Sequence, residues 1–341
     1  MSNIYVESGK RIFYLDELRA IAIICVILCH NSNLYLPHVY YNLKVAIPSF
    51  LNIIGLVGVP LFFMLSGALL LNRDYNLVDF FKRRFSRILY PAIFWIILTS
   101  ILVYPFFGVN EVIKIIFAQH RYTWFVWTMI GIYLIIPVIN SFIKEFKFNG
   151  IKYFLLIWFI TVILETFNLY PPLENLELSY FYGYVGYLVL GYYLVNKEFK
   201  LSNFSLIILG LILAITFTFA NMYINYNNIH IYTSYLSIFV ALAATGIVLL
   251  FRGLSDYFEN KNSNFHKKVK NGFAGKLIFL LSSCSYGMYF ANSLILKFVN
   301  QLNITSLKLL PVIYILVVIL SLVLVYLLSK ISILKRFSGA S

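Results

Sequence analysis

The chain has little charge. Of its 341 residues, 12% are Asp, Glu, Lys or Arg, whereas soluble domains carry about 25%. This shortage excludes a water-soluble enzyme and a disordered chain, because 61% of the residues are hydrophobic. At about 20 residues per membrane-spanning helix, the chain has room for about ten spans. The composition predicts an all-α, polytopic membrane helix bundle that forms one domain over residues 1–341, and its expected location is the cell (plasma) membrane.

Cysteine is scarce, and histidine shows no metal-ligand spacing. The three cysteines lie in apolar runs, which is no disulfide framework and favours their use as small apolar side chains. No metal site is expected, and the sequence lacks a phosphate-binding loop, a dinucleotide-binding glycine turn and a nucleophile-elbow serine. The histidines that fall in predicted loops, where solvation is expected, are His38, His120, His230 and His266.

Long charge-free intervals locate the spans. Two further spans contain charge: the first, with Asp16, Glu17 and Arg19 near its start, and the fifth, with Glu165. An interval of 51 residues holds two spans, separated by the polar turn 225–230. The total is ten. The charge-free intervals are 45–72, 88–110, 122–143, 178–196, 201–251, 277–296 and 309–329.

The positive charges fall mainly on one side of such a bundle. With the N-terminus inside, 21 of the 27 Lys and Arg residues lie on the inner side and five on the outer side. This asymmetry predicts that both termini are cytoplasmic. It also accounts for the net charge of +14, so membrane lipids are the expected partners and nucleic acid is not. Gly183, Gly186 and Gly191 in the sixth span are expected to allow close helix packing.

The first span carries ionisable residues at a helical spacing. Arg19 and His30 are eleven residues apart, about three turns and ~16 Å of rise, so they share nearly one face. Asp16 precedes Arg19 by three residues and can pair with it. A histidine at this depth usually lines a cavity, and desolvation keeps it neutral and able to accept a proton. The alternative is that Arg19 anchors the inner end of the span and His30 caps its outer end.

Two further positions have both a chemical and a topological interpretation. Arg84 and Arg87, in the loop expected after the second span, face one way if the segment is helical. Their guanidinium groups suit phosphate oxygens, but on the residues alone the positive-inside rule favours the interpretation of both arginines as topological signals. Glu165, in the outer part of the fifth span, either lines a hydrophilic pocket or flanks an acidic outer loop.

These segments resemble the integral-membrane acyltransferase 3 family. Residues 14–22 (YLDELRAIA) followed by His30 are similar to its opening helix, whose signature is an Arg, ten residues and a His. Residues 58–67 (GVPLFFMLSG) resemble its second helix, and residues 84–87 (RFSR) its Arg-x-x-Arg segment. Trp124-Phe125 followed by Tyr133 and Pro137 resembles its fourth helix, and residues 285–289 (SYGMY) are also family-like.

The resemblance implies an acyltransferase that moves an acyl group, usually acetyl from acetyl-CoA, to a hydroxyl group. The expected partners are acyl-CoA as co-substrate and, as acceptor, a cell-surface polysaccharide or lipid-linked sugar; no bound cofactor is expected. His30 is the catalytic histidine in this scheme, Arg19, oriented by Asp16, is its supporting cation, and Arg84 and Arg87 bind the CoA phosphates. The candidate acceptor-site residues are Glu165, Trp124 and Tyr133.

The chain departs from the family pattern at one position. Many members have a histidine soon after the Ser-Tyr-Gly segment, where this chain has Asn292. The resemblance is to the short, membrane-only form without an appended extracytoplasmic domain. A transporter or flippase of a lipid-linked glycan or organic anion is the alternative function, but the spans lack paired Gly/Pro interruptions in matching halves. Thioester consumption separates the two, because a transporter leaves acetyl-CoA intact.

Overall fold

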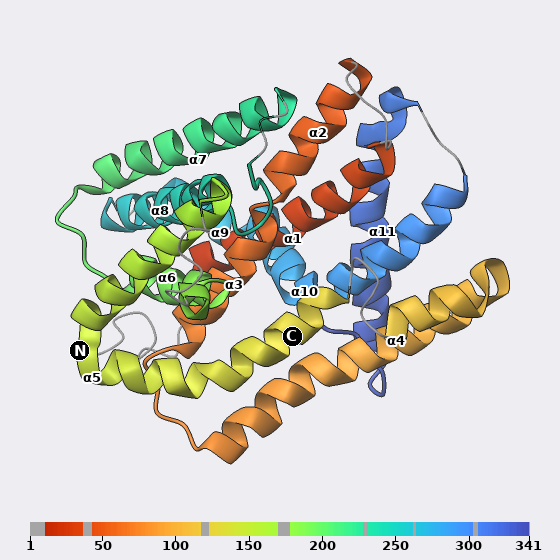
Figure 1. The fold of residues 1–341 in the computed structure, drawn as a ribbon. Coiled ribbons are helices and arrows are strands. Elements are labelled where there is room, and N and C mark those ends of the chain that lie inside the picture. The colour runs from red at the N-terminus through yellow and green to blue at the C-terminus, as the bar shows by residue number, and fades with distance from the viewer. Residues whose placement is uncertain are drawn as a thin grey trace. The chain divides into compact units, whose positions relative to one another are not determined.

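The computed structural model describes most of the chain, and the described part is helical (Figure 1). The described residues are 11–36, 43–116, 123–169, 178–227, 229, 231–261, 264–302 and 306–340. Within them there is no strand. The all-α fold predicted from the composition is therefore confirmed.

Eleven α-helices and three short 3₁₀ turns lie in the described ranges. The α-helices are α1 (Phe13–Ser32), α2 (Leu43–Gly55), α3 (Gly58–Leu70), α4 (Leu77–Ile116), α5 (Trp124–Thr166), α6 (Val185–Asn196), α7 (Asn203–Tyr226), α8 (Ile238–Asn260), α9 (Asn264–Asn271), α10 (Phe273–Gln301) and α11 (Leu310–Lys330). The 3₁₀ turns are η1 (Asn33–Tyr35), η3 (Leu178–Phe181) and η4 (Leu307–Leu309).

Seven helical segments in the described part are long and apolar enough to cross a membrane. A lipid environment favours helices because each backbone hydrogen bond is then made within its own segment. The prediction of ten spans is not confirmed: α1 carries three charged residues in its first turns, and α6 has only 12 residues. The seven segments are Ile47–Leu70, Leu77–Phe106, Trp124–Thr166, Asn203–Tyr226, Ile238–Asn260, Phe273–Gln301 and Leu307–Lys330.

Two long helices, α4 and α5, each include segments that the charge pattern predicts to be separate elements. The predicted fourth and fifth spans form α5, whose course breaks at Lys147, a residue with φ 51° and ψ −144°. Helix α4 begins at Leu77, so Arg84 and Arg87 lie on a helix and not in the loop expected for them. Asn76 caps α4, since its side-chain oxygen accepts hydrogen bonds from the backbone N–H groups of Val78 (2.9 Å) and Asp79 (3.3 Å).

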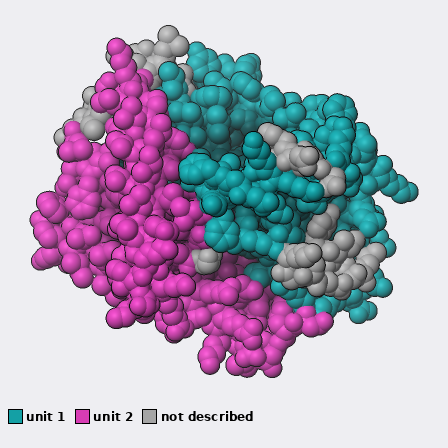
Figure 2. Space-filling model, turned by 180° about the vertical axis from the view of Figure 1, so that it is seen from behind, with its two compact units in different colours: residues 1–73, 138–279 teal, residues 74–137, 280–341 magenta. Residues whose placement is uncertain are grey.

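The chain divides into two compact units (Figure 2). Unit 1, in teal, comprises residues 1–73 and 138–279. Unit 2, in magenta, comprises residues 74–137 and 280–341. Helix α5 contributes its first part to unit 2 and the remainder to unit 1.

Unit 1 is held together by helices that approach at glycines. A Cβ at Gly67 would overlap the backbone of Leu188 on α6, and one at Gly191 would overlap the backbone of Met64 on α3. A Cβ at Gly186 would overlap the Trp158 ring of α5. Close packing is thus confirmed for Gly186 and Gly191. It is wrong for Gly183, which has φ 109° and open space around its Cβ position, so this glycine serves a turn.

Unit 2 is organised around Trp95 of α4. The Trp95 indole is fully buried, donates a hydrogen bond to the Ser338 carbonyl at 3.1 Å and stacks on Phe290 at 6.5 Å between ring centroids. Gly287 of α10 packs directly against Val325 of α11. These contacts unite α4, α10 and α11 with the C-terminal segment.

Candidate active site

Helix α1 positions three of the residues that the sequence predicts as functional. Asp16 and Arg19 lie in its first two turns and His30 in its last turn. The Asp16 and His30 side chains are buried, each 6% exposed, and Arg19 is half-buried. Because α1 is continuous from Phe13 to Ser32, the eleven-residue spacing of Arg19 and His30 is confirmed as helical.

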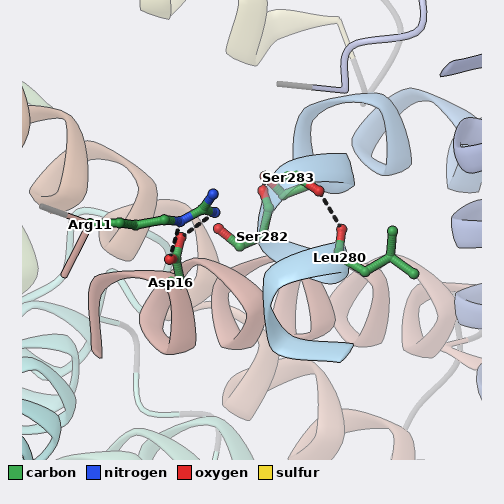
Figure 3. A network of polar contacts seen from close by, with 6 residues as sticks. Arg11, Asp16, Leu280, Ser282 and Ser283 are labelled. Carbon is green, nitrogen blue, oxygen red and sulfur yellow. Dashed lines mark hydrogen bonds and ion pairs between the residues drawn. The ribbon is translucent and has the colours of Figure 1, made fainter. Parts of the chain in front are cut away.

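Asp16 has a partner that the sequence analysis did not assign. Arg11 binds it with two hydrogen bonds, from Nε to Oδ2 and from Nη2 to Oδ1, the second at 2.8 Å (Figure 3). The Arg11 guanidinium also lies over the Phe279 ring, 3.9 Å from its centroid. In the sequence, Arg11 counts only as one of the positive charges on the inner side.

The end of α1 that carries His30 is fixed by hydrogen bonds to its polar neighbours. The Asn52 amide of α2 donates to the Asn33 side chain at 3.0 Å and to the Cys29 carbonyl at 3.2 Å. The Tyr235 hydroxyl lies 3.8 Å from the Cys29 sulfur. The Tyr187 hydroxyl donates to the Tyr235 carbonyl at 2.5 Å. His30 thus belongs to an end of unit 1 that carries several hydrogen-bonded polar side chains.

Asn31, next to His30, is a residue that the sequence analysis missed. It is completely buried, and both side-chain polar atoms lack a hydrogen-bond partner among the described residues. A buried amide without partners costs about 1–3 kcal/mol for each group left unsatisfied. Such groups are uncommon in native proteins, and each calls for an explanation such as a bound water, ion or ligand. Asn31 is therefore a candidate to bind a polar group of a ligand beside His30.

Glu165 also belongs to unit 1, in the last turn of α5. It is half-buried and acts electrostatically on the Tyr182 hydroxyl, as does Tyr232. The neighbouring Thr166 side chain accepts a hydrogen bond from the Ile238 N–H at 2.9 Å, which ties the end of α5 to the start of α8. Glu165 thus has a tyrosine hydroxyl in its electrostatic environment, and its assignment to a hydrophilic pocket stays a prediction.

Arg84 and Arg87 belong to unit 2, where α4 places them three residues apart on its second and third turns. Arg84 is half-buried over the Phe80 ring at 5.9 Å, while Arg87 is exposed. Phe80 stacks on Tyr75 at 4.4 Å. Burial raises the pKa of Tyr75 to about 12, although the positive charge of Arg84 acts in the opposite sense. One arginine is thus held on an aromatic surface and the other is free to reach an anion from solvent.

Tyr133 and Trp124, both on the first part of α5, occupy different parts of unit 2. Tyr133 meets Phe80 edge to face at 6.3 Å, so it lies beside the aromatic support of Arg84. The Trp124 and Phe125 rings lie 6.2 Å apart between centroids. Trp124 is nine residues before Tyr133 along α5. The two candidate acceptor residues are thus not brought together.

Asn292 and the loop histidines complete the predicted positions. Asn292 is completely buried on α10 and donates hydrogen bonds to the Met288 and Tyr289 carbonyls, at 2.8 and 2.6 Å. On the same helix the Ser283 hydroxyl donates to the Leu280 carbonyl at 3.0 Å (Figure 3). His38, His120 and His230 lie outside the described residues, as does the side chain of His266.

The helices and the buried polar residues define a multi-pass membrane protein with ionisable groups inside its helical units. A family model described as an acyltransferase domain, that of the acyltransferase 3 family, matches residues 12–330. The chain belongs to this family, as the sequence motifs predict. No curated protein and no solved structure matches the chain significantly.

Proposed function

We propose that the protein transfers an acetyl or other acyl group from acyl-CoA to a hydroxyl of a cell-surface polysaccharide or lipid-linked sugar. The observation that carries the proposal is the acyltransferase family match over residues 12–330. The buried position of His30 in the last turn of α1 supports its role as the catalytic histidine. The acceptor class and the acyl-CoA donor are expectations from the family resemblance.

In the proposed reaction, the acceptor oxygen attacks the thioester carbonyl carbon while His30 accepts the hydroxyl proton. The carbon–sulfur bond then breaks, CoA leaves as a thiol after taking up a proton, and an ester is formed. A two-step variant has His30 itself carry the acyl group before the acceptor arrives. Arg19 stabilises the negative charge that develops, and Arg84 and Arg87 bind the CoA phosphates.

Asn31 supplies a further function in this scheme. Its buried amide, without a partner among the described residues, is one residue from His30. An amide N–H₂ donates two hydrogen bonds, and a thioester carbonyl that becomes an oxyanion accepts them. We assign Asn31 to this oxyanion.

The short helix α6 supports an approach for the acceptor from the membrane. Its 12 residues rise about 18 Å, well below the roughly 30 Å of a bilayer core. We therefore expect the preceding turn η3 and the segment through Tyr184 to lie at membrane depth. Irregular backbone is tolerated there when it lines a water-filled cavity. Tyr182, near Glu165, belongs to this segment, so a hydroxyl-rich acceptor has polar groups to meet.

The test is acetyl-CoA binding and thioester cleavage by the purified protein in lipid nanodiscs. His30→Ala is expected to bind acetyl-CoA normally and to lose cleavage. Arg84→Ala/Arg87→Ala is expected to lose binding. Lys82→Ala/Arg83→Ala removes two exposed cations of the same helix, so it is the charge-matched control and is expected to keep binding. Full cleavage by folded His30→Ala would overturn the catalytic assignment, and unchanged binding by Arg84→Ala/Arg87→Ala would return both arginines to a topological role.

A further inference from the structure

Residues from four separate segments meet at one end of unit 1. Arg252 of α8 is 5% exposed and donates a hydrogen bond to the Lys197 carbonyl, just after α6, at 2.7 Å. The Lys197 ammonium lies over the Phe148 ring of α5 at 5.0 Å. Asn72, just after α3, forms a side-chain hydrogen bond with Tyr192 of α6. The ends of α3, α6 and α8 and the middle of α5 therefore form one basic end.

A small cavity lies at this basic end. Its volume is about 90 Å³, several times the roughly 10–15 Å³ that one water molecule needs. It therefore has room for a group the size of a phosphate. The lining residues are Asn72, Ile143, Lys144, Lys147, Phe148, Ile151 and Tyr192.

The backbone at this cavity has an uncommon conformation. Three non-glycine residues in the described ranges have positive φ, and two of them, Asn72 (57°) and Lys147 (51°), line the cavity. With ψ −144°, Lys147 occupies a region that glycine adopts far more readily. Asn140 fixes the neighbouring loop, because its amide donates to the Arg73 carbonyl at 2.9 Å. A lysine kept where glycine would relax the backbone points to a use for its charge.

The lining combines two kinds of surface. Lys144 and Lys147 provide ammonium donors and Asn72 an amide, with the exposed Glu145 between the two lysines as the acidic neighbour in the chain. Ile143, Ile151 and Phe148 form an apolar wall. This combination suits an anionic group that is attached to an apolar chain.

Beyond the cavity, α5 carries a stripe of exposed apolar side chains. Its members recur every three or four residues, so they share one face of the helix. Each is at least 40% exposed, which gives an acyl chain a surface to lie against. The stripe consists of Tyr153, Leu156, Ile160 and Ile163.

We propose that this cavity binds the phosphate of an anionic phospholipid headgroup, with Lys144, Lys147 and Asn72 as donors and the acyl chain along the α5 stripe. Basic pockets at the ends of membrane helices are a recurrent type of lipid headgroup site. The proposal does not rest on the acyltransferase reaction, because it is argued from the lining of the cavity and not from the residues proposed for catalysis.

The experiment measures retained lipid by native mass spectrometry after release from nanodiscs of phosphatidylcholine with phosphatidylglycerol. Wild type is expected to retain phosphatidylglycerol selectively. Each lysine removed weakens retention roughly fivefold, so Lys144→Gln/Lys147→Gln is expected to lose it almost completely. Lys152→Gln removes an exposed lysine of the same helix that does not line the cavity, and it is expected to match wild type.

Lys147→Gly tests the lysine charge separately from the strained backbone conformation at this position. Glycine relaxes the positive-φ backbone, so this variant is expected to unfold at the same or a higher temperature in phosphatidylcholine and still to retain less phosphatidylglycerol. Equal retention of both lipids by wild type, or unchanged retention by the double variant, would overturn the proposal. Weaker acetyl-CoA binding by Lys144→Gln/Lys147→Gln, with its lipid retention unchanged, would also overturn the proposal, because the cavity would then bind a phosphate of the acyl donor.

Discussion

In the last turn of α1, the buried Asn31 amide lies beside the buried His30 side chain. His30 and Asn31 are both removed from water, yet Asn31 has no hydrogen-bond partner within the described part of the chain. Ser32, the next residue, is equally buried but donates its hydroxyl to the Leu28 carbonyl at 2.7 Å. Two adjacent polar residues in one environment are therefore a matched pair for separating function from folding.

Asn31→Ala is expected to raise the unfolding temperature and to lower thioester cleavage by about 10²–10³-fold. The stability gain follows from removing an unsatisfied buried amide, and the loss of rate from removing an oxyanion donor. The measurements are thermal unfolding in detergent and CoA release. Ser32→Ala is the control and is expected to keep its activity. A fully active and less stable Asn31→Ala would show that the amide is structural.

At the scale of the helix, the sequence predicts where helices form better than where they begin and end. Charge-free intervals identify helix interiors because charged residues rarely enter a bilayer core. They missed the start of α4, although Asn76 as N-cap and Asp79 in the first turn are a legible signal in the sequence. They also missed the role of Arg252, because its acceptors are backbone carbonyls 55 and 58 residues away. Contacts of that kind leave no local pattern.

The crossing of α3 and α6 depends on side-chain size. Gly191→Ala is expected to lower the free energy of unfolding by about 1–3 kcal/mol, because the added Cβ overlaps the Met64 backbone and no rotamer relieves this. Gly131→Ala, on an exposed turn of α5 with open space around the Cβ position, is expected to leave stability unchanged or higher. Thermal unfolding of the purified variants measures both. Equal losses in the two variants would contradict a packing role for Gly191.

At the scale of the whole molecule, the sequence predicts the class and the family correctly, while the orientation in the membrane stays a prediction. Composition alone leads to a helical membrane protein because few soluble folds tolerate so little charge. The division into two compact units was not foreseen, since it groups segments that are distant in the sequence. Of the predicted site, Asp16, Arg19, His30 and Glu165 belong to unit 1, and Arg84, Arg87, Trp124 and Tyr133 to unit 2.

The predicted cytoplasmic C-terminus is tested at the two ends of α11. Lys308→Cys and Lys335→Cys replace exposed residues on either side of this helix. In intact cells a membrane-impermeant maleimide is expected to label Lys308→Cys, and to label Lys335→Cys only after permeabilisation, because the Lys and Arg asymmetry places residue 335 inside. The reverse pattern would invert the topology.

The native thiols favour such experiments. Cys25, Cys29 and Cys284 are all free and all buried, so bulky charged reagents that require solvent access reach an added surface cysteine first. Spin labels or fluorophores can therefore be attached in pairs to the otherwise native chain. Distances between its helices can therefore be measured in a bilayer, in the presence and absence of acyl-CoA. No native cysteine has to be removed first.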